Sequence, residues 1–76
     1  MTLADMKENK QYQIAGINTK DSKLFERFIA LGMNKGAKTC LLEKSIDSSN
    51  IAIVSNNTRI ALRIEEAKEV VVRELP

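Results

Sequence analysis

The fold is decided by two strands and the turn between them at residues 51–63, which read Ile51-Ala52-Ile53-Val54-Ser55-Asn56-Asn57-Thr58-Arg59-Ile60-Ala61-Leu62-Arg63. The first four residues are an apolar run of strand length, and the last five alternate between polar and apolar side chains. Because asparagine tolerates positive φ, Asn56 and Asn57 predict a tight hairpin turn. The alternation predicts that Ile60 and Leu62 point inward, toward a core.

Three more short strands are predicted on the two sides of this hairpin. Residues 12–17 predict the first strand, with a bulge or kink at Gly16. Residues 39–42 predict the second strand, and the valines at 70–72 predict the last. Residues 45–50 are rich in Ser, Asp and Asn and therefore predict a loop.

One long helix is predicted at about residues 22–31, where apolar side chains recur at helical spacing. These side chains form one broad apolar face made of Leu24, Phe25, Phe28, Ile29 and Leu31. Asp21 or Ser22 can cap the helix, and Gly32 can end it because glycine accepts the left-handed conformation of a closing turn. Together with the five strands, this segment predicts a mainly β fold.

We expect a single domain over residues 1–76, built as a small closed β-barrel of about five strands with one inserted α-helix. Short helical turns are predicted near residues 2–6 and 64–67. In the first of these turns Thr2 and Asp5 have the spacing of a capping box. Closure of the barrel would remove exposed strand edges, which otherwise invite aggregation.

The chain lacks the side chains that most enzymes and metal sites use. It has 76 residues, a formal net charge of +2 and no histidine, so the usual general base and the usual metal ligand are absent. Cys40 is the only cysteine, and its position in a predicted strand indicates a buried, inert thiol. Glu65, Glu66 and Glu69 predict a solvated helical turn. We expect no enzymatic activity, no cofactor and no intrinsic metal site.

A cytoplasmic location is predicted from two features. One cysteine cannot form an intramolecular disulfide, which is typical of a reducing compartment. The residues after Met1 include Asp5, Lys7 and Glu8 where a signal peptide would be apolar. The apolar runs are far shorter than the ~20 residues that span a bilayer, so membrane insertion is not expected.

Four motifs in the observed order resemble the ferrous iron transport protein A (FeoA) family. They are the opening Thr2-Leu3-Ala4-Asp5-Met6, the strand Ile14-Ala15-Gly16-Ile17, the helix end Leu31-Gly32-Met33-Asn34-Lys35-Gly36 and the segment Ile60-Ala61-Leu62-Arg63-Ile64-Glu65-Glu66-Ala67. A run of valines follows, and the resemblance extends over nearly the whole chain. One segment departs from the family, since residues 45–50 lack the Gly and Pro of its usual loop.

The resemblance implies an SH3-like barrel and a cytoplasmic accessory role in bacterial ferrous iron uptake. The implied partner is the membrane ferrous iron transporter with a cytoplasmic G-protein domain (FeoB type), which the protein would bind and modulate as a monomer or weak oligomer. A barrel without catalytic groups acts through surface contact. We therefore predict a partner surface at Met33, Asn34, Lys35 and Arg59. Two alternatives stay open: Met33 plugs the end of the barrel, and Arg59 is an ordinary exposed strand arginine.

Two other functions are also open at this point. The first is a small nucleic-acid-binding SH3-like barrel, although such proteins usually carry aromatic stacking residues on a basic face and this chain has few aromatics. For this reason we expect no nucleic-acid partner. The second is a stand-alone regulatory barrel related to the C-terminal domains of metal-dependent repressors.

Overall fold

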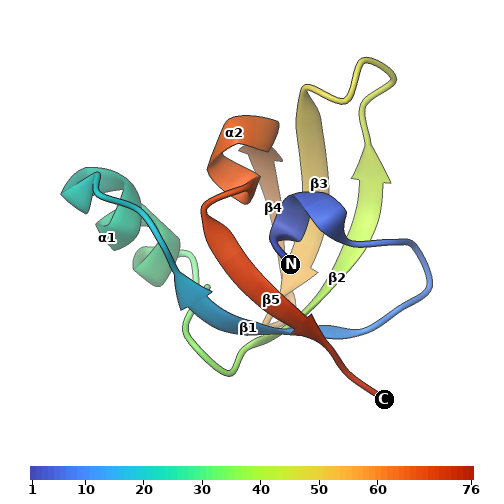
Figure 1. Ribbon diagram of the computed structural model, residues 1–76, viewed down its shortest axis with the longest axis horizontal. Coiled ribbons are helices and arrows are strands. Elements are labelled where there is room, and N and C mark those ends of the chain that lie inside the picture. Colours follow the sequence, from blue (N-terminus) through green and yellow to red (C-terminus); the bar gives the residue numbers. More distant parts are fainter.

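Five antiparallel strands form one curved sheet in the computed structural model, which describes residues 1–76 (Figure 1). The strands are β1 (Tyr12–Ile17), β2 (Lys38–Lys44), β3 (Asn50–Ser55), β4 (Thr58–Arg63) and β5 (Val70–Glu74). Their order in the sheet is β4-β3-β2-β1-β5. The helical elements are η1 (Leu3–Asp5), a 3-10 turn, and the α-helices α1 (Ser22–Ala30) and α2 (Ile64–Ala67). The predicted mainly β fold with one inserted helix and two short helical turns is confirmed.

The β3–β4 hairpin forms at the predicted place. Asn56 and Asn57 both have positive φ, at 52° and 65°, which matches the right-handed twist of the flanking strands. The turn sets the register of the two strands, in which Ser55 pairs with Thr58. From there, consecutive side chains along each strand point to opposite faces of the sheet. As a result Ile60 and Leu62 are buried as predicted.

The core lies inside the curve of the sheet and contains 14 buried apolar residues. Every strand contributes to it, and β3 contributes Ile51 and Ile53. Phe28 from α1 and Leu3 from η1 enter this core with no exposed surface. The inserted helix and the N-terminal turn therefore each contribute a fully buried side chain to the core.

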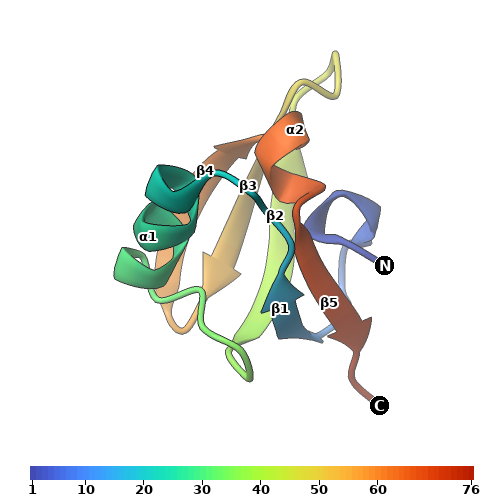
Figure 2. The same ribbon diagram turned by 60° about the vertical axis from the view of Figure 1, so that its left-hand side comes forward.

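The five strands curve into the predicted small barrel, but the hydrogen-bonded ladder does not close between β4 and β5, so only the expected removal of strand edges is corrected. The gap is crossed by α2, whose Ala67 is fully buried (Figure 2). The chain's own N-terminus covers part of the outer edge of β5, through a bridge between Thr2 and Val71. The other edge, β4, has no second strand beside it.

Helix α1 begins at the predicted Ser22 and ends at Ala30, one residue before the predicted end. The Asp21 carboxylate accepts hydrogen bonds from the backbone N–H groups of Lys23 and Leu24, and Gly32 follows the helix with φ +85°. The expected broad buried face is too wide, however. Phe25 and Ile29 are 42% and 39% exposed, because only the stripe around Phe28 reaches the core.

Hydrogen bonds order two short segments of the chain. In η1, the Thr2 N–H donates to the Asp5 carboxylate at 2.8 Å, which confirms the capping box and lowers the pKa of Asp5. In the β2–β3 loop, the hydroxyls of Ser45 and Ser49 each donate to Asp47 at 2.7 Å. The hydrogen bond from the Ser49 hydroxyl has the largest effect, followed by that from Ser45, and they lower the pKa of Asp47 to about 2. This loop is therefore ordered without the Gly and Pro of the family pattern.

Candidate interaction surface

The outer face of β2, β3 and β4 carries apolar side chains where a solvated sheet face is usually polar. In the register of the sheet Cys40 faces Val54, Val54 faces Arg59, and Ala52 faces Ala61. Cys40, Ala52 and Val54 are half-buried, while Arg59 and Ala61 are exposed. We refer to these five side chains, together with Leu42, as the outer patch.

A bulge in β2 places Glu43 beside Leu42 on this face. The pairing of β2 with β3 shifts register between Leu41 and Glu43, so that Glu43 faces Ala52. The extra residue of a bulge breaks the strict alternation of side chains along a strand. Leu41 remains in the core, whereas Leu42 and Glu43 are both exposed and line the same hollow as Ala52. The bulge thus adds the acidic Glu43 to the border of the outer patch, while Leu42 lies on this face by the ordinary alternation from Cys40.

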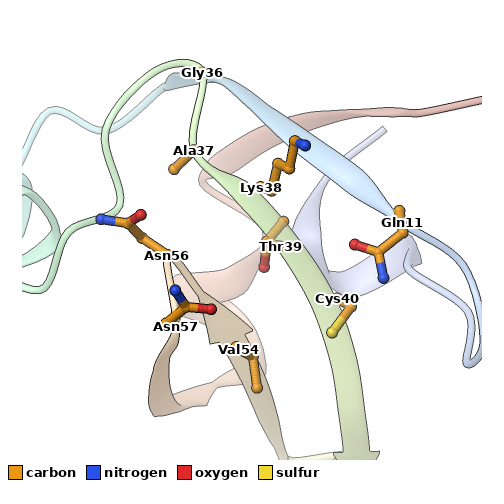
Figure 3. Close-up of a pocket in the computed structure, with 9 residues that line it drawn as sticks. All are labelled: Gln11, Gly36, Ala37, Lys38, Thr39, Cys40, Val54, Asn56 and Asn57. Carbon is orange, nitrogen blue, oxygen red and sulfur yellow. The ribbon is translucent and has the colours of Figure 1, made fainter.

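Two hollows adjoin the outer patch. The larger, of about 530 Å³, is lined by Cys40 and Val54 and extends to the hairpin turn at Asn56 and Asn57. Figure 3 shows Cys40 and Val54 on adjacent strands, with the two asparagines at one end and Gln11 at the other. The smaller hollow, of about 330 Å³, is lined by Leu42, Glu43, Ala52 and Arg59. The surface is therefore uneven and can receive a protruding side chain.

The charges around the outer patch are mostly positive. Lys38, Arg59 and Arg63 are exposed on these strands, and Glu43 is the acidic side chain among them. The protein has two ion pairs, Lys10–Glu74 and Arg27–Glu66, and neither uses these cations. The three cations consequently lack carboxylate partners within the chain.

The interpretation of Cys40 as a fully buried thiol is corrected. Its side chain is half-buried and lines the larger hollow on the outer face. Its neighbours along β2, Thr39 and Leu41, are the residues that point into the core. The strand assignment was right, but the thiol belongs to the opposite face.

The four predicted partner-binding residues differ in burial and in the segment that carries them. Met33 has no exposed surface and belongs to the core, so its placement on an exposed partner surface is corrected in favour of the alternative that it fills the end of the fold. Asn34 and Lys35 are exposed in the turn between α1 and β2. Arg59 lies on β4 and is part of the outer patch, so it alone joins the surface described above.

Sequence reasoning missed Cys40, Leu42, Ala52 and Val54 as surface residues. A signal was present in residues 51–54, because four consecutive apolar residues place two apolar side chains on each face of a strand. In an antiparallel sheet with one solvated face, this pattern marks a second apolar surface. The same alternation along residues 39–42 places Leu42 on the face of Cys40, whereas the bulge that turns Glu43 to this face had no comparable signal.

No group of three or more Cys, His, Asp and Glu side chains is arranged to hold a metal ion. No helix of the structure has the length and apolar composition needed to cross a membrane.

The comparison with protein families identifies the chain. The family model described as FeoA domain matches residues 1–74. The protein belongs to the FeoA family. A relative in Helicobacter pylori, named Fe(2+) transport protein A, is 32% identical over 74 residues, which cover 97% of this chain and 95% of the relative. The sequence resemblance is thereby confirmed, and this FeoA chain is a protein associated with ferrous iron transport.

Solved structures support the same fold. The FeoA protein of Stenotrophomonas maltophilia in complex with zinc, described as a prokaryotic SH3 domain protein, superposes with a TM-score of 0.84 at 28% identity, covering 96% of this chain and 89% of that one. A manganese-dependent transcriptional repressor superposes with a TM-score of 0.88 at 16% identity, covering 97% of this chain and 40% of the repressor. The second likeness shows the fold alone.

Proposed function

We propose that this FeoA chain is a cytoplasmic accessory protein of bacterial ferrous iron uptake, which binds and modulates the membrane ferrous iron transporter through its cytoplasmic G-protein domain (FeoB type). The match of the FeoA family model to residues 1–74 carries the proposal. In this role residues 1–76 act as a single domain and the iron is cargo of the transporter. The protein itself performs no catalysis.

The exposed surface supports a binding role. The outer patch combines half-buried apolar side chains with unpaired cations at its border, which is the general composition of a protein-binding surface. Aromatic side chains for stacking nucleic-acid bases are missing from it, since Tyr12 and Phe28 are buried and Phe25 lies on α1. These observations favour a protein partner over a nucleic acid.

The proposal is tested by measuring binding and transport separately. In a calorimetric titration, the purified protein is expected to bind the purified cytoplasmic domain of the transporter saturably. Cells that lack the gene should take up less radioactive Fe(II) under anaerobic conditions and should recover when the gene is restored. Uptake that does not depend on the gene would contradict the proposal, as would salt-sensitive binding to RNA or DNA with no binding to the transporter domain.

A further inference from the structure

We propose that the outer patch is the surface that receives the transporter, and that its occupant is a protein segment with an apolar side chain flanked by carboxylates. This inference rests on the proposed function and assigns a place and a chemistry to the contact. Two features of the structure carry it. They are the apolar rows across β2, β3 and β4, and the cations beside those rows that have no partner within the chain.

The apolar part of the patch predicts that the occupant presents an apolar side chain at the centre of the contact. Cys40 and Val54 face each other at one hollow, while Leu42 and Ala52 line the other. Leu42 is 36% exposed although it is a large apolar residue, and the alternation of side chains along β2 places it on the same face as Cys40. Covering such side chains removes apolar surface from water, and a protruding apolar group from a partner can fill a hollow beside them.

The positively charged border of the patch predicts carboxylates on both sides of that apolar side chain in the partner. Arg59 faces Val54 directly across the β3–β4 ladder, so its guanidinium stands beside the apolar row. Lys38 lines the larger hollow, and Arg63 lies four residues beyond Arg59 on the same face of β4. Glu43 is the acidic side chain at the patch, so the net charge there is positive. Carboxylates on the partner therefore complement this border.

A second copy of the chain fits the patch less well. Two copies related by a two-fold axis present the same patch to each other. That arrangement would set three cations of each copy against a single carboxylate of the other, which is unfavourable once the charges lose water. The charge balance thus favours a different, acidic protein over self-association.

Cys40 provides a direct reporter, because the only thiol of the chain lies within the patch. The test measures the rate at which N-ethylmaleimide alkylates the protein, with and without a saturating amount of the transporter's cytoplasmic domain. We expect the bound domain to slow alkylation of Cys40 about tenfold or more, since buried contact surfaces exclude solvent. The matched control carries Cys40→Ser and Lys23→Cys, which moves the thiol to exposed α1, and its alkylation rate should not change.

Substitutions test the same surface by affinity. Arg59→Glu reverses a border charge and Leu42→Asp places a carboxylate in the apolar row, and each is expected to weaken binding about tenfold or more. Lys23→Glu, an equal charge reversal on α1, should leave the affinity unchanged. Circular dichroism verifies that each variant is folded, which both exposed positions on the sheet should permit.

The outcomes separate the surface from the function. If the wild-type protein binds but Cys40 stays fully reactive, or both patch variants bind as tightly as wild type, the surface is wrong and the proposed function stands. If the wild-type protein does not bind the domain, the proposed function fails and the partner named for this surface fails with it. Protection of Cys40 by raising the protein's own concentration, or by RNA alone, would also overturn the inference.

Discussion

Ile53 and Val54 are neighbours in β3, yet they belong to two different surfaces of the molecule. Ile53 has no exposed surface and packs in the core, whereas Val54 is half-buried on the outer face beside Cys40. Their side chains are almost equally apolar. The difference is set by the two-residue period of a strand, which sends consecutive side chains to opposite faces.

The comparison shows that alternate residues of one strand belong to two apolar surfaces, of which the inner serves stability and the outer is the proposed binding surface. The inner face is filled by β-branched and aliphatic side chains, and its stabilisation is realised within the chain. The outer face keeps part of its apolar surface in water, which is the surface that the proposed partner would cover. Substitutions on the inner face should therefore affect folding, and those on the outer face should affect binding.

The largest expected effect tests whether Met33, in the turn between α1 and β2, belongs to the same core as the inner face of the sheet. Met33→Asp would bury an unpaired carboxylate, at a cost of about 3 kcal/mol or more, comparable with the whole stability of so small a domain. We expect the variant to be largely unfolded by circular dichroism. Lys35→Asp, two residues away and exposed, should unfold at nearly the wild-type urea concentration. Equal unfolding midpoints for the two variants would show that Met33 is not part of the core.

A smaller effect sharpens the comparison within β3 itself. Ile53→Ala removes fully buried methyl groups and should lower the free energy of unfolding by about 2–5 kcal/mol. Val54→Ala removes half-buried ones and should lower it by about 1 kcal/mol or less. Urea denaturation measures both values. Similar losses at the two positions would mean that the outer face contributes to the core after all.

The smallest effect concerns the loop that joins β2 to β3. The Ser49 and Ser45 hydroxyls lower the pKa of Asp47 to about 2, below the ordinary value of about 3.9 in an unfolded chain. Because the folded pKa is the lower one, these hydrogen bonds stabilise the loop above about pH 4 and are lost as the pH falls through about 2. An NMR titration of the Asp47 carboxyl carbon should show that midpoint.

A titration midpoint near the ordinary aspartate value would show that the loop is not ordered by these hydroxyls. Asp47→Asn supplies the control. The Ser49 backbone N–H donates to Asp47 at 3.1 Å, so its amide chemical shift should follow the titration in the wild type and should not change with pH in the variant. Binding to the transporter domain should be unaffected by this variant, since residue 47 lies outside the outer patch.

Most of the fold was predictable because its signals are local. The positive φ of Asn56 and Asn57, the cap at Asp21 and the end of α1 at Gly32 each depend on residues close in the sequence. The bulge at Gly16 was also predicted correctly, as shown by the register shift between Ile14 and Gly16. The open side between β4 and β5 was not, because strand pairing at the ends of a ladder depends on elements far apart in the chain.

The candidate surface was less predictable than the fold. Arg59 was named from the sequence and lies on the outer patch, while Asn34 and Lys35 lie in a neighbouring turn. Met33 was misplaced because a methionine after a helix reads the same whether it fills a core or faces a partner. Only the packing of the other elements around it distinguishes these two positions.

By itself, the sequence determined the strands, the turns, the caps and the absence of histidine chemistry, because each depends on side-chain type and near-neighbour spacing. The tertiary structure alone decided which apolar residues remain partly exposed. The register sets Cys40 beside Val54 on the outer face, Leu42 stays exposed next to them, and Met33 packs in the core. The burial of a side chain depends on which distant segments pack around it, so a local sequence pattern cannot predict it.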